Sequence, residues 1–410
     1  MFMSPVSWSL CLALGAALST STPTCDAATL LAGRSTATLD SASSRETTGV
    51  IETTGGPITG VHLTSSAWVD QAFYGVPYAA PPTGRRGRWQ PPRELEPWAS
   101  VLPCNATRPS CFGRDVPGVN TSFMSEDCLY LDIYTPSKAV MDASAASSSA
   151  SASASASASA SRTPSQPPPP PSSPPPPLLP VMVYLHGGSL VEGSSTAIQS
   201  GFGGVANTTR AGVISISINY RVSVLGFLAL DALAEADARS SGGAAGRRVA
   251  GNYGLLDCIA ALRWVQANAR AFGGDPARVT VYGQSSGGSL VLALAVSPLA
   301  GGLFASGISM SGSPRLSATL KEASTVWHPE VVNATRCGPF PGGKVGGAME
   351  EEAHMEARSS GAPMGAEKGA EKGVEKGVGR DGLLDCLHNL TGAELQAALP
   401  KDWHSAAFDM

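Results

Sequence analysis

Short, almost continuous apolar runs alternate with helical stretches in the second half of the chain. Residues 179–185 (LPVMVYL) and 213–218 (VISISI) have the length and the apolar or β-branched content of buried strands. Residues 254–272 repeat apolar positions at the spacing of a helix, and glycine and proline directly after them end it. Residues 279–282 predict a third strand, and residues 289–296 a helix after it. This alternation favours an α/β fold with a mostly parallel sheet and helices on both faces.

The turn between the third predicted strand and its helix carries the pattern Gly-X-Ser-X-Gly, as Gly283-Gln284-Ser285-Ser286-Gly287. In a strand–turn–helix, this pattern lifts the serine hydroxyl above the sheet, and the glycines leave room for the sharp turn. The N-terminus of the helix directs free N–H groups toward developing negative charge. Ser285 is therefore the candidate nucleophile, and the alternative is an ordinary Gly/Ser turn.

A second glycine-rich loop, His186-Gly187-Gly188-Ser189, follows the first predicted strand. Acyl transfer at a serine needs backbone N–H groups that stabilise the oxyanion, and such a loop upstream of the nucleophile commonly supplies them. The alternative is a β-turn that owes its glycines to flexibility alone.

Charge and cysteine spacing exclude several other classes of protein. The chain has 410 residues, with 28 Lys+Arg against 32 Asp+Glu and a net charge of −4. Because there is no basic excess to face phosphates, a nucleic-acid binder is not expected. The eight cysteines form no CxxC pair and no Cys/His cluster, so we expect no metal site, and nothing indicates another cofactor.

Only 15% of the residues are charged, because low-complexity tracts interrupt the chain. Residues 143–161 are Ser/Ala-rich, residues 164–177 are mostly proline, and residues 341–380 contain a Gly-X-Glu-Lys repeat. We expect insertions at 137–177 and 341–380 in the surface loops of one domain spanning 48–410, since loop closure tolerates length. The alternative is a docking or glycosylated stalk.

The N-terminus predicts export. An apolar stretch from Val6 to Leu18 leads into small residues, so we expect a signal peptide at 1–19 and a linker over 20–47. The alternative, a membrane anchor, would need a longer apolar stretch, and no later segment reaches that length. We therefore expect a secreted or secretory-pathway protein with no further transmembrane segment.

Glycosylation sequons support the same compartment. Five of the eight asparagines stand in Asn-X-Ser/Thr, where about 1.5 are expected by chance. These are Asn105, Asn120, Asn207, Asn333 and Asn389. An oxidising compartment also favours disulfides.

Taken together, these segments resemble the type-B carboxylesterase/cholinesterase family of the α/β-hydrolase superfamily. The matching stretches are FYGVPYAAPP (73–82), SEDCLYL (125–131), residues 181–188, NYRV (219–222), GNYGLLD (251–257), residues 264–266, 272–276, 283–287, 302–304 and 309–313. The resemblance covers roughly residues 48–405, with the tracts as insertions. It implies hydrolysis of a small-molecule carboxylic ester through a serine acyl-enzyme, with Ser285 as the nucleophile.

The resemblance also implies the oxyanion donors, which are the backbone N–H groups of Gly188, Ser189 and Ser286. Ser189 stands where the family usually has Gly, and Ser286 where it usually has Ala. Gln284 replaces a commoner Glu, which removes a negative charge beside the site and predicts weaker attraction for cationic substrates.

Cysteine pairing and two ion pairs are carried over in the same way. The resemblance implies that Cys128 pairs with an upstream cysteine, Cys111 rather than Cys104, and that Cys337 pairs with Cys386. The family's buried ion pairs fall on Arg88 with Glu126 and on Arg221 with Asp257. Cys258 is expected to be a buried free thiol.

The acid and the histidine of the family's triad are expected beyond residue 410, so we expect this fold to be incomplete at the C-terminus. None of the histidines at 62, 186, 328, 354, 388 and 404 lies in a motif for a catalytic base. Three hypotheses remain: an incomplete form of an active esterase, a non-catalytic binding or adhesion protein like some family members, or a folding-defective chain with an exposed strand edge.

Overall fold

The computed structural model describes residues 46–64, 66–114, 123–137, 140, 177–196, 204–240, 250–314, 328–338 and 380–399. The expected signal peptide, nearly all of the 20–47 linker and most of both insertions lie outside these residues. Asn120, His354 and His404 lie outside them as well.

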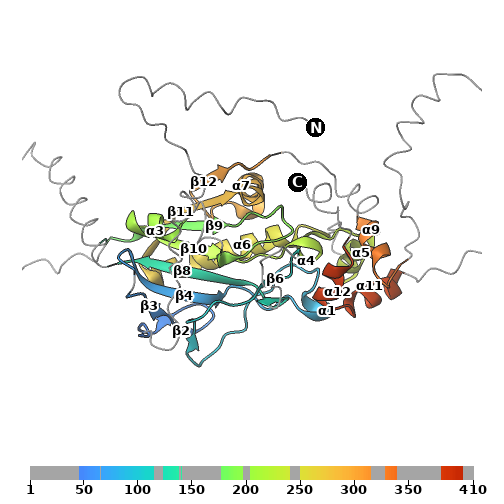
Figure 1. The fold of residues 1–410 in the computed structure, drawn as a ribbon, viewed down its shortest axis with the longest axis horizontal. Coiled ribbons are helices and arrows are strands. Elements are labelled where there is room, and N and C mark those ends of the chain that lie inside the picture. The colour runs from blue at the N-terminus through green and yellow to red at the C-terminus, as the bar shows by residue number, and fades with distance from the viewer. Residues whose placement is uncertain are drawn as a thin grey trace, which may run out of the picture. The chain divides into compact units, whose positions relative to one another are not determined.

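A seven-stranded sheet forms the centre of the described fold, in the order β12-β11-β9-β10-β8-β4-β3 (Figure 1). Its strands are β3 (Val61–His62), β4 (Val69–Pro77), β8 (Tyr130–Pro136), β9 (Leu179–Leu185), β10 (Ile214–Ile218), β11 (Gly274–Gln284) and β12 (Ser306–Met310). The pairings among β9, β10, β11 and β12 are parallel, and those that involve β3, β4 and β8 are antiparallel.

The expected α/β class is confirmed, and the three strands predicted from apolar runs lie in the parallel part of the sheet. Every residue of β10 is buried, as expected for a central strand covered on both faces. The sheet as a whole is mixed rather than mostly parallel, because the strands before residue 137 add an antiparallel half that the apolar pattern did not single out.

Helices pack on both faces of the sheet. Side chains of α6 (Tyr253–Asn268) and α7 (Ser286–Val296) join the larger core with Val183 and Val281. On the opposite face, α3 (Val205–Arg210) packs through Val205 against a smaller tyrosine-rich core. The predicted helix over 254–272 is α6 continued by the 3-10 turn η4 (Ala269–Phe272), and it ends at Gly273, whose φ is +81°.

Shorter elements complete the described chain. Two small sheets are formed by β1 (Ile51–Glu52), β2 (Pro57–Thr59) and β5 (Leu102–Pro103), and by β6 (Ser110–Cys111) with β7 (Met124–Ser125). The remaining helices are α1 (Gly84–Gly87), α4 (Ser223–Phe227), α5 (Asp231–Ser240), η5 (Pro298–Ala300), α9 (His328–Ala334), α11 (Arg380–His388) and α12 (Gly392–Ala397). In Figure 1 the red helices α11 and α12 lie beside the blue α1, so segments about 300 residues apart in sequence are neighbours.

Two disulfides hold peripheral segments, and they are the pairs that the resemblance implies: Cys111–Cys128 and Cys337–Cys386. Cys104 and Cys258 are buried free thiols. Burial raises the pKa of the Cys104 thiol to about 12 and that of Cys258 well above its ordinary value, so both are protonated near neutral pH and poor nucleophiles.

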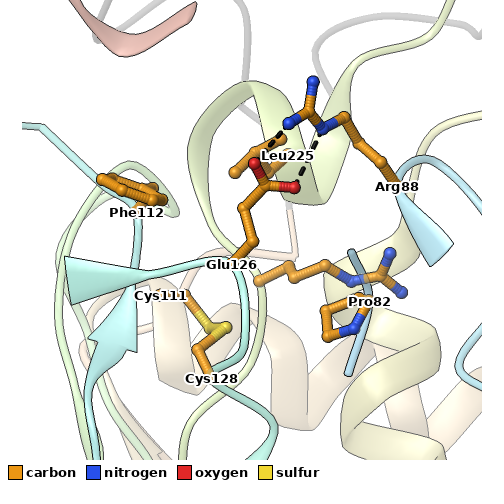
Figure 2. A pocket seen from close by; sticks show the side chains of 8 residues that line it. Pro82, Arg88, Cys111, Phe112, Glu126, Cys128 and Leu225 are labelled. Carbon is orange, nitrogen blue, oxygen red and sulfur yellow. Dashed lines mark hydrogen bonds and ion pairs between the residues drawn. A yellow bond between two sulfur atoms is a disulfide. The ribbon is translucent and has the colours of Figure 1, made fainter. Parts of the chain in front are cut away.

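Both expected ion pairs are present, Arg88 with Glu126 and Arg221 with Asp257. The Arg88 guanidinium donates hydrogen bonds to both carboxylate oxygens of Glu126, beside the Cys111–Cys128 disulfide, as Figure 2 shows. Arg88 also donates to the carbonyl oxygens of Leu387 and Leu390, at 3.1 and 2.7 Å. This one side chain therefore links α1, the disulfide-bonded loop and α11.

Candidate active site

Ser285 lies at the junction of β11 and α7, in a conformation that few non-glycine residues adopt. Its φ is 57° and its ψ is −127°, and it is the N-cap residue of α7. This is the strained strand-to-helix turn that Gly-X-Ser-X-Gly predicts. The side chain is half-buried rather than covered by packed neighbours.

The flanking glycines are required by close backbone approach. A Cβ on Gly283 would collide with the backbone of Gly287, and a Cβ on Gly287 would collide with the carbonyl oxygen of Leu185. Neither glycine has a positive φ, so their role is steric rather than conformational. The Ser285 N–H donates to the Met310 carbonyl at 2.8 Å, which ties the turn to the end of β12.

The loop after β9 packs directly against this turn. A Cβ on Gly187 would lie 2.6 Å from the Gln284 carbonyl oxygen and 3.2 Å from the Ser285 Cβ. Gly188 follows with a φ of +119°, and then Ser189 and Leu190 with φ values of 54° and 59°. These residues therefore form a tight turn at the carboxyl end of β9, next to the turn that carries Ser285.

Ser286 makes a second contact between the turn and the loop. Its Oγ accepts a hydrogen bond from the Leu190 N–H at 3.2 Å. Ser286 is also the first residue of α7, where backbone N–H groups have no partner inside the helix. This hydrogen bond joins the loop that contains Gly188 and Ser189 to the turn that carries Ser285.

His186, which begins the loop, is a packing residue. Its ring is buried and stacks on Tyr220 with 4.1 Å between centroids, and its Nδ1 lies 2.9 Å from the Gly187 carbonyl oxygen. Burial lowers the pKa of His186 to about 4, so the ring is neutral at physiological pH. Its carbonyl accepts a hydrogen bond from the Tyr220 hydroxyl, which fixes the start of the loop.

Within the described residues, no histidine hydrogen-bonds the Ser285 hydroxyl. His62 pairs with Asp70 at 3.1 Å, His328 accepts from the Ala229 N–H at 2.7 Å, and His388 packs on Trp89. The described part of the site therefore holds a candidate nucleophile and candidate oxyanion donors, and none of its histidines contacts the candidate nucleophile as a base would.

A buried polar network behind the loop was missed by the sequence analysis. Asp132 on β8 accepts from the Gly75 N–H at 2.8 Å and from the Ser195 hydroxyl at 2.9 Å. The Ser195 N–H in turn donates to Asn219 at 2.7 Å. Burial raises the pKa of Asp132 to about 6, although both hydrogen bonds lower it. Its one signal in the sequence is a single acid inside the apolar run Leu131-Asp132-Ile133.

The candidate sequons have different exposures. Asn105, Asn207 and Asn389 are exposed, and Asn333 is half-buried at the last turn of α9. Among the described residues, no cluster of His, Cys, Asp and Glu could hold a metal ion. None of the helices in that part of the chain is long and apolar enough to cross a bilayer.

A strained serine on a strand–turn–helix, beside a glycine-rich loop on the neighbouring strand, defines an α/β-hydrolase of the esterase type. The family model of the carboxylesterase family matches residues 47–357. The chain belongs to this family.

Similar proteins include the cocaine esterase of Homo sapiens, 33% identical in an alignment of 289 residues that covers 68% of this chain and 42% of that protein. The fumonisin B1 esterase of Sphingopyxis macrogoltabida is 36% identical over 62% of this chain and 39% of its own length. The chain therefore spans about two fifths of the length of these relatives.

Solved structures agree with this fold. A PNB esterase superposes with a TM-score of 0.55 and 28% identity, over 85% of this chain and 52% of that chain. The juvenile hormone esterase of Manduca sexta, with OTFP covalently attached, has a TM-score of 0.53 and 27% identity over 85% of this chain and 50% of its own.

Proposed function

We propose that this protein hydrolyses carboxylic esters through a serine acyl-enzyme formed on Ser285. The observation that carries the proposal is the placement of Ser285, at a φ of 57° on the β11–α7 turn, beside Gly187 of the loop that follows β9. Membership of the carboxylesterase family supports the same chemistry.

In the proposed reaction, the Ser285 Oγ attacks the ester carbonyl carbon and its proton passes to a general base. The negative charge that develops on the carbonyl oxygen is stabilised by the N–H groups of Gly188, Ser189 and Ser286. Collapse of the tetrahedral intermediate expels the alcohol, which takes up the proton, and leaves an acyl-serine that water hydrolyses. The resemblance assigns the base to a histidine, which none of the described residues supplies at Ser285.

The proposed substrate is a small ester that is neutral near its reacting carbonyl. Gln284 packs beside Gly187, since its Oε1 would lie 3.1 Å from a Cβ at that position. Because Gln284 is uncharged where the family more often has a carboxylate, the site offers less attraction to a cationic alcohol group.

Chemical rescue tests this function in the 410-residue chain. If Ser285 and its donors are in place and the base is missing, added imidazole should accelerate hydrolysis of p-nitrophenyl butyrate. Imidazole also cleaves this ester in solution, so Ser285→Ala is the matched control. We expect an imidazole-dependent rate above that control, and equal rates in the two proteins would overturn the proposal.

A second candidate function is a non-catalytic binding or adhesion protein with the same fold. The observation that favours it is the lack of a histidine at Ser285 within the described residues, where His186, His328 and His388 have other contacts. It requires that Ser285 stay unreactive with imidazole present, while the chain remains folded.

We also propose that the protein is exported, with a signal peptide at 1–19 and a domain from 48 that carries the two insertions. The disulfides Cys111–Cys128 and Cys337–Cys386 suit an oxidising compartment. Exposed Asn105, Asn207 and Asn389 are the first glycosylation candidates, with Asn120 and Asn333. After expression in secreting eukaryotic cells, the protein should be found in the medium. Treatment with an N-glycosidase should lower its mass, because the glycans are removed.

A further inference from the structure

We propose that the Ser286 hydroxyl is a positioning group. It holds the loop after β9, which carries the proposed oxyanion donors Gly188 and Ser189, against the turn of Ser285. Its Oγ accepts the Leu190 N–H at 3.2 Å, which joins the first turn of α7 to the loop after β9. This inference rests on the proposed function for its kinetic consequence, and on the structure alone for the contact itself.

The conformation of this loop depends on contacts with the rest of the protein, because its backbone is strained. Ser189 and Leu190 are consecutive non-glycine residues in the left-handed region, with φ values of 54° and 59°. An isolated residue of either type rarely adopts this conformation, since its Cβ approaches the following carbonyl oxygen. Such conformations persist where surrounding contacts determine them.

Two hydrogen bonds form within the loop itself. The N–H groups of Val191 and Glu192 both donate to the Gly188 carbonyl, at 3.0 and 3.1 Å. These two bonds shape the turn, but they do not fix where the turn sits relative to Ser285.

Leu190 provides two of the loop's connections to the rest of the molecule, and the Val191 carbonyl adds a third by accepting from the Arg114 N–H at 2.7 Å. Its side chain is 2% exposed, and its carbonyl accepts from the Ser223 N–H at 2.7 Å. Its own N–H is the group that reaches the helix carrying the nucleophile, through Ser286. Loss of that bond would leave a buried N–H without its partner, which favours relaxation of the turn.

The consequence concerns the donors next to Leu190. The N–H groups of Gly188 and Ser189 must point at the position of the oxyanion, and small errors in donor placement cost rate. Because Ser286 contributes both a backbone N–H near Ser285 and a side chain that fixes Leu190, one residue couples the two halves of the proposed oxyanion hole.

Amide exchange tests the contact without any need for activity. In Ser286→Ala we expect the Leu190 amide to exchange about tenfold faster by NMR, because its acceptor is gone. The matched control is Ser289→Ala on the same helix, whose Oγ accepts the Ser313 N–H at 3.0 Å. That variant should leave Leu190 unchanged. Unchanged exchange at Leu190 in Ser286→Ala would overturn the proposal.

A double-mutant cycle tests the consequence for the site. With imidazole present, the rate at which a fluorophosphonate labels Ser285 should fall about tenfold in Ser286→Ala. Glycine at 189 removes the strain at that position, so Ser286→Ala in a Ser189→Gly background should cost less than about threefold. Equal losses in both backgrounds would contradict positioning through the loop.

The two readouts separate this inference from the proposed function. If the unaltered chain is not labelled at Ser285, the proposed function fails, and Leu190 exchange alone decides whether Ser286 holds the loop. If labelling occurs and Leu190 exchange is insensitive to Ser286, the function stands and the positioning role is wrong.

Discussion

Asp132 and Asp257 are both buried carboxylates, but only Asp257 has a charged partner. Asp257 accepts hydrogen bonds from the Arg221 guanidinium at 2.7 and 2.8 Å, so its negative charge is compensated. Asp132 receives two neutral donors, Gly75 N–H and the Ser195 hydroxyl. Desolvation therefore raises the pKa of Asp132 to about 6, so ionisation of this buried carboxyl group destabilises the folded chain.

Asp132→Asn should change the pH dependence of stability. The pKa of Asp132 is higher in the folded chain than its ordinary 3.8, so the folded state binds the proton more tightly, and stability is lost as pH rises from about 4 to about 6. The asparagine variant lacks this loss, which amounts to about 3 kcal/mol at 1.36 kcal/mol per pKa unit.

Urea denaturation of both proteins between pH 4 and pH 7 measures this difference. Burial lowers the pKa of His186, which acts in the opposite direction, but it does so in both proteins and cancels in the comparison. Parallel stability curves would show that Asp132 does not titrate in the folded state as described.

Elements of the parallel half were predictable because burial on both faces leaves a simple pattern. The runs at 179–185 and 213–218 became β9 and β10, and the helix at 254–272 became α6 with η4. The antiparallel strand β4 mixes polar and apolar residues, as VDQAFYGVP. Its place in the sheet depends on pairing with β8, about sixty residues away, which no local pattern reveals.

In the candidate site too, only the features with a local sequence pattern were predictable. Gly-X-Ser-X-Gly predicted the strand–turn–helix position of Ser285, because the sharp turn needs glycine on both sides. The left-handed conformations of Ser189 and Leu190 could not be predicted, since residues of these types rarely adopt them without tertiary contacts. The network of Asp132 joins segments 57 and 63 residues apart, which is beyond the reach of sequence spacing.

Asp257→Ala should strongly lower the stability of the folded chain, because Asp257 on α6 pairs with Arg221 in the segment that leads into α4. Removing Asp257 leaves Arg221, whose side chain is 3% exposed, as an uncompensated buried charge, and breaking such a pair costs about 3–5 kcal/mol. The measurement is the denaturant midpoint. Asp275→Ala is the control, because Asp275 pairs with Arg278 at the surface and should leave the midpoint nearly unchanged. Equal midpoints for the two variants would contradict the assignment.

Across the whole described fold, the two ends of the sheet differ. At one end, the short β3 finishes the antiparallel half. At the other, β12 pairs with β11 on one side, and Ile308 on β12 is 46% exposed. Within the described residues no strand covers the outer edge of β12, and an exposed apolar edge favours self-association.

Ile308→Lys should therefore reduce association of the purified chain. A lysine on an edge strand disfavours pairing with another edge. Light scattering after size-exclusion chromatography, over a concentration series, should show a smaller associated fraction than in the unaltered chain. Val50→Lys is the control, since Val50 is 52% exposed and directly precedes β1, which belongs to a different sheet from β12. Equal association in both variants would show that β12 is not responsible.

The most direct test of Ser285 as an activatable nucleophile is to identify the residue that a fluorophosphonate modifies. The chain is treated with the probe in the presence of imidazole, and the adduct is located by peptide mass spectrometry. We expect one adduct, on Ser285, and none in Ser285→Ala. If the folded chain gave no adduct, or one on another serine such as Ser189, then Ser285 would not be the nucleophile.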